Sequence, residues 1–155
     1  MAREFGPAAD RHHSRLEVRT PERRALAEAD PDRVRQIIRI LLDNALSHTP
    51  EGVKVTVTTT QDSGRAELIV SDEGAPGIGP RAQARVFDRF FTGDSASGSG
   101  LGLAIARELA ERMEGRLTVV SSKAFTAFIL DLPPAPPAPK PSRQKPDEAA
   151  SGAAT

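Results

Sequence analysis

The sequence predicts an α+β fold with a single domain, because helical and strand periodicities both occur and occupy separate segments. Three observations support this prediction. A long amphipathic helix pattern precedes two strand patterns joined by a tight turn, and a second helix pattern opens directly after a glycine-rich loop. A chain of 155 residues is long enough to bury one core and short for two.

The first predicted elements are a short strand and the long helix. Leu16 and Val18 alternate with charged residues, which is typical of a strand, and the segment 25–29 is a candidate partner strand. Asp30 suits a helix N-cap and Pro31 the first helical position, so we expect the helix to begin there. The apolar residues that follow at helical spacing are Val34, Ile37, Ile38, Leu41, Leu42 and Ala45.

The middle of the chain predicts a hairpin. The segment 49–52 ends the helix, and Val53, Val55 and Val57 then alternate with polar residues, which predicts a strand with one solvent-exposed face. An Asp-Ser-Gly turn at 62–64 leads into a second strand over 65–71, whose apolar centre indicates deeper burial.

The last third of the domain predicts two helices and two strands. A short helix carries Val86, Phe87 and Phe90, and a longer one covers 101–113 and ends with a left-handed cap at Gly115. The two closing strands are expected over 117–120 and 125–130.

The two ends of the chain differ from this domain in composition. Residues 1–14 are polar and irregular, and we expect a flexible N-terminus before a domain over 15–132. Seven of the 13 prolines fall between 133 and 146. The segment 133–155 is therefore predicted to be a disordered tail rich in proline and alanine, because it cannot bury a core.

Composition excludes several classes of function. The formal net charge is zero and the pI is about 6.8, which argues against a protein that binds nucleic acid or membrane surfaces by charge. The chain has no cysteine, which suits a reducing compartment. No apolar run approaches the roughly 20 residues that span a bilayer. We therefore expect a cytoplasmic protein without membrane contact.

Three glycines introduce the second long helix. Gly98, Gly100 and Gly102 alternate through a short loop whose backbone freedom only glycine gives cheaply. The loop ends where the N–H groups and positive dipole end of the helix point outward, which favours a phosphate. The same pattern also serves as a plain turn, so other segments must identify a nucleotide site.

Two polar residues are candidates for such a site. Asn44 lies on a polar flank of the long helix, where its carboxamide oxygen suits Mg²⁺; an ordinary surface asparagine is the alternative. Ile40 shares this flank, and an apolar residue there indicates a covering lid or ligand. Asp72 follows a buried strand and precedes Gly74 and Gly77. Its carboxylate suits the 6-amino group of adenine, and a turn-forming aspartate is the alternative.

Four segments, in this order, resemble the N, G1, F and G2 boxes of the catalytic, ATP-binding domain of sensor histidine kinases. That domain shares a superfamily with gyrase-type and MutL-type ATPases, and the F box favours the kinases. The boxes are 41–50 (N), 72–78 (G1), 86–91 (F) and 98–105 (G2). The resemblance covers residues 16–132 and implies a two-layer α/β sandwich, the Bergerat ATP-binding fold. Its mixed, mostly antiparallel sheet would pack on about three helices.

The resemblance implies a role for each matching residue. Asn44 would bind the Mg²⁺ ion that bridges the triphosphate, which makes it the expected catalytic residue. His48 would lie beside the adenine or ribose, and Asp72 would bind the adenine amine in a pocket shaped by Gly74 and Gly77.

The F and G2 boxes are implied to hold and form a lid. Phe87 and Phe90 would anchor the base of a mobile lid over 92–98. The residues expected to close over the phosphates are Gly98, Gly100, Leu101, Gly102 and Leu103.

The sequence departs from the family pattern near the phosphates. A second asparagine is usual at the position of Ile40, and a lysine is frequent at the position of Ser47. Ala75 is one extra residue between the glycines of the G1 box, and a late glycine is missing near Ala124. The departures at Ile40 and Ser47 bear on turnover more than on adenine binding. For Ala75 two alternatives stay open: the extra residue bulges outward, or it displaces Gly77 from the base.

The resemblance implies an ATP-dependent protein histidine kinase that also needs Mg²⁺. None of His12, His13 and His48 has a phosphoacceptor context, so the accepting histidine would lie on a separate dimerisation domain or chain, with a response regulator downstream. The isolated chain is expected to be a monomer. Two alternatives are a regulatory nucleotide-binding module without turnover, which the departures favour, and an anti-sigma-type serine kinase, against which the F box counts.

Overall fold

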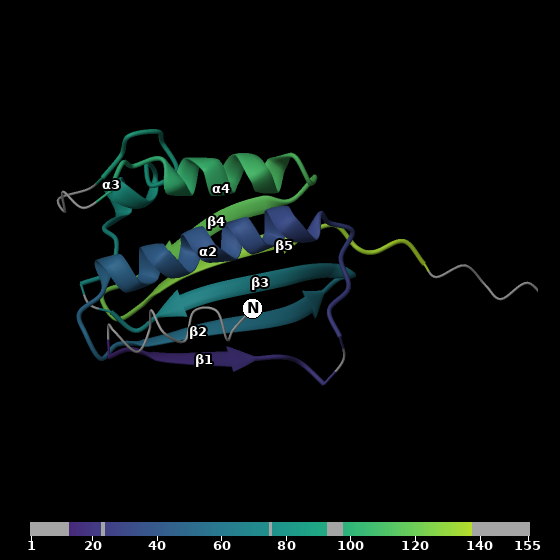
Figure 1. Cartoon of the computed structure of the whole chain (residues 1–155), viewed down its shortest axis with the longest axis horizontal. Helices are drawn as coiled ribbons and strands as arrows, with labels where there is room; N and C mark the ends of the chain where they lie inside the picture. Colours follow the sequence, from purple (N-terminus) through teal and green to yellow (C-terminus); the bar gives the residue numbers. More distant parts are fainter. Residues whose placement is uncertain (1–12, 23, 75, 93–97, 138–155) are drawn as a thin grey trace, which may run out of the picture.

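A five-stranded sheet and a layer of helices on one of its faces make up the domain (Figure 1). The computed structural model describes residues 13–22, 24–74, 76–92 and 98–137. The strand order is β1-β2-β3-β5-β4; β1 pairs with β2 in parallel, and the other three pairs are antiparallel. The predicted two-layer α/β sandwich with a mixed, mostly antiparallel sheet is confirmed.

Eight elements follow one another along the described part of the chain. The strands are β1 (Arg15–Arg19), β2 (Lys54–Asp62), β3 (Arg65–Asp72), β4 (Arg116–Ser121) and β5 (Thr126–Leu132). The helices are α2 (Pro31–His48), α3 (Pro80–Gln83) and α4 (Gly102–Glu111). Among the described residues, no helix has the length and apolar character needed to cross a membrane.

The start of α2 follows from its first residues. One carboxylate oxygen of Asp30 accepts hydrogen bonds from the N–H groups of Asp32 at 2.9 Å and Arg33 at 3.3 Å, and Pro31 occupies the first turn. The helix ends at His48, before the extended Thr49. The apolar stripe of α2 packs into the core through Ile37, Ile38, Leu41, Leu42 and Ala45.

The predicted hairpin joins β2 to β3. Ser63 and Gly64 both have positive φ, 49° and 85°, as a two-residue turn matched to the twist of its strands requires. The alternation along β2 is only partly as predicted. Val55 and Val57 face the core, but Thr56, expected on the exposed face, is also buried between the neighbouring strands β1 and β3.

The register places three polar side chains in one row at an end of the sheet. Asp72 pairs with Thr126 on β5, which pairs with Ser121 on β4. Because side chains alternate between faces along a strand, Asp72 lies on the same face as the buried Val70, two residues earlier. The polar row therefore continues the core on the face that the helices cover.

The segment 25–29 is not the partner strand of β1, so that prediction is wrong. Leu16 and Val18 align instead with Val55 and Val57 of β2; Leu16 packs against the core, whereas Val18 is exposed. Ala27 forms an isolated bridge with Pro134 beyond β5. The start of the segment predicted as a tail is thus held against the domain, while 138–155 lies outside the described residues.

Two local predictions in the last third are also wrong. The short helix is α3, and Val86, Phe87 and Phe90 follow it in turns rather than within it, since Phe90 has a φ of 65°. At the end of α4 the left-handed residue is Glu114, with a φ of 56°, not Gly115. A Cβ at Gly115 would lie 2.6 Å from the Asp131 carbonyl oxygen, so close packing on β5 accounts for this glycine.

Candidate nucleotide-binding site

The four boxes meet at one end of the domain. Figure 1 shows the C-terminal ends of α2 and β3, the short α3 and the start of α4 at the same end of the sheet. The contacts described below join the N box to the G1 box and the F box to the G2 box, although Asn44 and Leu103, the first and last candidate residues, are 59 positions apart in the sequence. The site is therefore built by tertiary packing of distant segments.

Asp72 is the buried acid of this site. Its side chain is 6% exposed, and its Oδ1 accepts a hydrogen bond from the Gly74 N–H at 3.0 Å. Burial raises the pKa of the Asp72 carboxyl above its ordinary value, and the Gly74 N–H and the nearby His48 oppose that shift. A buried carboxylate with this environment is suited to accept a hydrogen bond from a ligand amine.

The end of the N box packs against the G1 box. A Cβ added at Gly74 would lie 2.6 Å from Thr49 Cγ2, so only glycine fits beside this side chain. Thr49 is fixed in turn by its hydroxyl, which donates to the Ala45 carbonyl at 2.7 Å. The sequence suggested only a helix stop at Thr49, because its contact with Gly74 is tertiary.

The predicted metal ligand lies on α2 beside the start of α4. Asn44 is half-buried; its backbone carbonyl is 3.0 Å from Nδ1 of the exposed His48. Ile40, one turn earlier, is covered as its apolar character predicted: its Cγ2 would lie 3.3 Å from a Cβ at Gly102. No group of three or more acidic, histidine or cysteine side chains in the described part of the chain is arranged to hold a metal ion.

The G1 loop docks on the turn between β4 and β5. Gly77 has a φ of 67°, and a Cβ there would overlap the Ser122 carbonyl oxygen. The Ile78 N–H donates to Ser121 Oγ at 2.8 Å, and Gln83 Nε2 donates to the carbonyls of Ile78 at 2.7 Å and Ser121 at 3.1 Å. Ala75, the extra residue of this loop, lies outside the described residues.

Sequence reasoning missed the polar row beside Asp72. Thr126 is 5% exposed and its Oγ1 lies 2.8 Å from Ser121 Oγ. The one signal for Thr126 in the sequence is a hydroxyl residue at the start of an otherwise apolar strand. Its place next to Asp72 depends on the β3–β5 register, which the sequence does not specify.

The F box and the G2 box are joined through their backbones. The Phe90 N–H donates to the Gly100 carbonyl at 2.9 Å, and Gly100 has a φ of 67°. A Cβ at Gly100 would lie 2.6 Å from the Phe90 carbonyl carbon. The Phe90 ring itself is 73% exposed, whereas Phe87 packs edge-to-face on Phe128 with ring centroids 6.1 Å apart.

At the base of the predicted lid, the structure thus has the backbone contact between Phe90 and Gly100 and the packed ring of Phe87. Gly98 also has a positive φ, 119°, and stands in open space. Of the lid predicted over 92–98, residues 93–97 lie outside the described part of the chain.

The start of α4 suits an anion. Leu101 precedes the helix without a side-chain cap, and Gly102 and Leu103 form its first turn. The first N–H groups of a helix have no acceptor within the helix, and the N-cap residue Leu101 provides no side-chain acceptor for them. Together with the positive end of the helix dipole, these groups are suited to a phosphate.

Comparisons with known proteins agree with this architecture. A family model described as histidine kinase-, DNA gyrase B-, and HSP90-like ATPase matches residues 29–136. The probable sensor kinase SilS of Salmonella typhimurium is 39% identical over 113 residues, a match that covers 70% of this chain and 22% of SilS. The chain thus spans less than a quarter of the length of this curated relative.

Solved structures of histidine kinases share the fold. The mycobacterial sensor histidine kinase MprB matches with a TM-score of 0.74 and 32% identity, over 87% of this chain and 94% of the MprB chain. Full-length ShkA in complex with AMPPNP matches with a TM-score of 0.75 and 30% identity, over 85% of this chain and 28% of ShkA. This chain therefore belongs to the family of histidine kinase-, DNA gyrase B- and HSP90-like ATPases, with sensor histidine kinases as its relatives.

Proposed function

We propose that this chain is the ATP-binding catalytic domain of a two-component sensor histidine kinase. The observation that carries the proposal is the buried Asp72 carboxylate, which lies where the N and G1 boxes meet. Asp72 would accept a hydrogen bond from the adenine amine, in a pocket bounded by Gly74, Gly77 and His48. The solved ShkA complex with an ATP analogue supports this choice of ligand.

The triphosphate would lie between α2 and the start of α4. Gly100, Leu101, Gly102 and Leu103 would cover the phosphates with backbone donors. Asn44 would supply one oxygen ligand to Mg²⁺, and phosphate oxygens and water would supply the rest, in keeping with the absence of a protein cage among the described residues. Bound Mg²⁺ would neutralise charge on the phosphates.

The proposed reaction transfers the γ-phosphoryl group of ATP to a histidine nitrogen on a separate dimerisation domain or chain. The domain's contribution is positioning and electrostatics, since this transfer needs little covalent chemistry from the protein. A response regulator would then accept the phosphoryl group. We propose a cytoplasmic location and a monomeric state for this chain by itself.

Calorimetric titration with a non-hydrolysable ATP analogue, with and without Mg²⁺, tests the binding part. We expect ATP-type ligands to bind more tightly than GTP, and Asp72→Asn to weaken binding while the fold is retained. Asn44→Ala should remove the Mg²⁺-dependent part of the affinity. Equal binding of adenine and guanine nucleotides would contradict the role of Asp72.

Labelling with γ-³²P-ATP tests the transfer. The chain alone should not label itself stably, but it should label a separately supplied histidine hairpin from its cognate kinase. Failure to label that hairpin while ATP still binds would favour the second candidate, a regulatory module without turnover.

One contact favours that second candidate. The resemblance implies an asparagine at the position of Ile40, and the apolar Ile40 side chain, which lies beside Gly102, offers no polar group to a phosphate or to Mg²⁺. Ile40→Asn combined with Ser47→Lys would restore two polar groups, each expected to contribute about 1–3 kcal/mol. Faster transfer by this double variant with unchanged adenine affinity would support a slow kinase; no transfer at all would support the module.

A further inference from the structure

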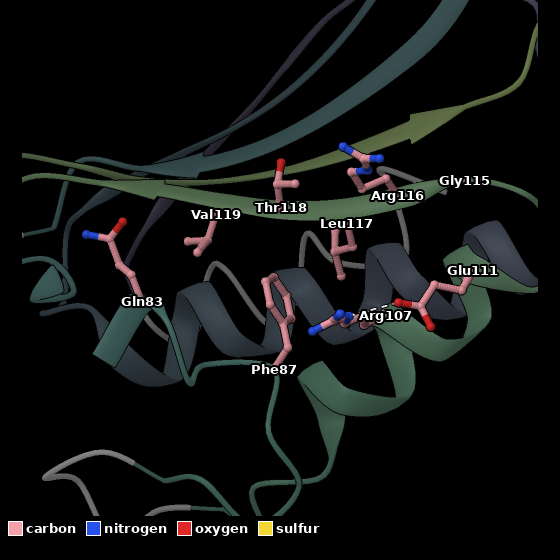
Figure 2. Close-up of a pocket in the computed structure, with 9 residues that line it drawn as sticks. All are labelled: Gln83, Phe87, Arg107, Glu111, Gly115, Arg116, Leu117, Thr118 and Val119. Atoms are coloured by element: carbon pink, nitrogen blue, oxygen red, sulfur yellow. Dashed lines mark hydrogen bonds and ion pairs between the residues drawn. The ribbon is translucent and has the colours of Figure 1, made fainter. Parts of the chain in front are cut away.

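A cavity of about 540 Å³ opens at the edge of the sheet, between β4 and α4. Leu117 and Val119 line it from β4, and Phe87 and Arg107 line it from the helix layer (Figure 2). Figure 2 shows Leu117 and Val119 pointing toward the helices, whereas Thr118 points to the opposite side. Of the residues predicted to bind nucleotide, only Phe87 lines this cavity, so it is a separate site.

The edge of β4 carries unused backbone groups. The Ser122 N–H donates to the Phe125 carbonyl at 2.9 Å, which fixes the alternation of ladder bonds between β4 and β5. Every second residue of an antiparallel strand bonds to a given neighbouring strand, so Val120 and Thr118 also bond to β5. The backbone N–H and C=O groups of Leu117 and Val119 therefore point away from β5. No described residue hydrogen-bonds to those outward groups.

One end of this edge is already closed. Gln83 Nε2 donates to the Ser121 carbonyl at 3.1 Å and so caps the next outward acceptor along β4. The free stretch therefore centres on Leu117 and Val119, directly beside the cavity. An edge that is closed at one end and free beyond it defines where an added strand ends.

The lining of the cavity indicates which side chains an added strand would carry. Leu117, Val119 and the Phe87 ring are apolar, and the Arg107 guanidinium lies 5.9 Å from the centre of that ring. Arg107 is already paired with Glu111 at 2.9 Å. Arg116 is exposed; Asp131 lies opposite it on β5 but is ion-paired with Arg65, and no ion pair within the described part of the chain includes the Arg116 side chain. The cavity thus suits apolar side chains, and its rim suits an acidic one.

We propose that β4 binds an extended segment of another protein as a sixth strand. The segment would have apolar side chains at positions i and i+2, which enter the cavity, and an acidic residue that pairs with Arg116 across the strands. A second copy of this chain is a poorer occupant. The β4 strand of a second copy, RLTVVS, has no acidic residue that could pair with Arg116.

A display library of random linear decapeptides, selected against the whole chain, tests the proposal. Enriched peptides should alternate apolar and polar residues and include an acidic one. In a synthetic copy of the best binder, N-methylation of one alternate set of amides should weaken binding at least tenfold, and N-methylation of the other set should not.

Two variants at one position isolate the backbone contact. Val119→Pro removes the outward N–H without breaking a bond to β5, and should weaken peptide binding at least tenfold. Val119→Thr keeps both the N–H and the shape, and should bind like the parent. Because the fixed φ of proline also acts on the strand itself, Arg116→Glu provides a second test and should reverse the preference for acidic peptides.

Three results would overturn the proposal. One is a selection that enriches no peptide over beads without protein. Another is peptide binding unaffected by both Val119→Pro and Arg116→Glu. The third is sedimentation showing that the parent chain self-associates and that Val119→Pro abolishes this, which would make a second copy the occupant of the edge.

Discussion

The junction between Phe90 and Gly100 can be tested by adding one methyl group. In Gly100→Ala the new Cβ would lie 2.6 Å from the Phe90 carbonyl carbon, 2.8 Å from its Cα and 2.9 Å from the Phe91 nitrogen. All three are backbone atoms, which cannot turn aside as the end of a flexible side chain can. The substitution must therefore separate the F box from the G2 box.

The size of the effect follows from two terms. An L-residue at the φ of 67° found at Gly100 costs about 1–2 kcal/mol relative to glycine. Separation of the two boxes also breaks the hydrogen bond from the Phe90 N–H, which contributes about 0.5–1.5 kcal/mol. The closed junction should thus lose about 1.5–3.5 kcal/mol, which corresponds to nucleotide binding weakened by roughly 10- to 300-fold.

Gly64→Ala is the matched control. Gly64 has a φ of 85° and nothing within 4 Å of an added Cβ, so this variant has the conformational term without the overlap. It should lose about 1–2 kcal/mol of global stability in urea and bind the ATP analogue like the parent. Gly100→Ala should instead lose affinity in calorimetry and protection of the Phe90 N–H in hydrogen exchange. Parent-like affinity together with a protected Phe90 amide would refute the reasoning.

Three further predictions concern stability. Burial raises the pKa of the Asp72 carboxyl, so the folded chain binds this proton more tightly than the unfolded chain does. The parent should therefore gain stability relative to Asp72→Asn as the pH falls from 7 through the raised pKa. Urea unfolding of both proteins at several pH values checks the sign, and a difference in stability that does not change with pH would contradict it. Gly77→Ala should lower the melting temperature more than Gly52→Ala, since both have positive φ but only Gly77 faces a backbone oxygen, that of Ser122. Asp30→Ala should cost about 1 kcal/mol in urea unfolding through loss of the α2 cap, and an unchanged midpoint would show that the cap contributes nothing.

Local signals in the sequence were sufficient for the long helix, for the hairpin and for the order of the boxes. Asp30 and Pro31 mark the start of α2 because a cap and a fixed φ act within one turn of chain. Ser63 and Gly64 likewise form the hairpin turn, where Gly64 adopts a positive φ that the absence of a Cβ permits. The burial of the α2 stripe followed from its 3.6-residue spacing alone.

Contacts between distant segments were decided only by the tertiary structure. The sequence predicted 25–29 as the partner strand of β1, but β1 pairs in parallel with β2 instead. The contact of Thr49 with Gly74 and the row that sets Thr126 beside Asp72 depend on strand register and helix packing. Residue spacing constrains what lies within a turn or a hairpin, whereas these contacts are set by how the whole core packs, so no local pattern encodes them.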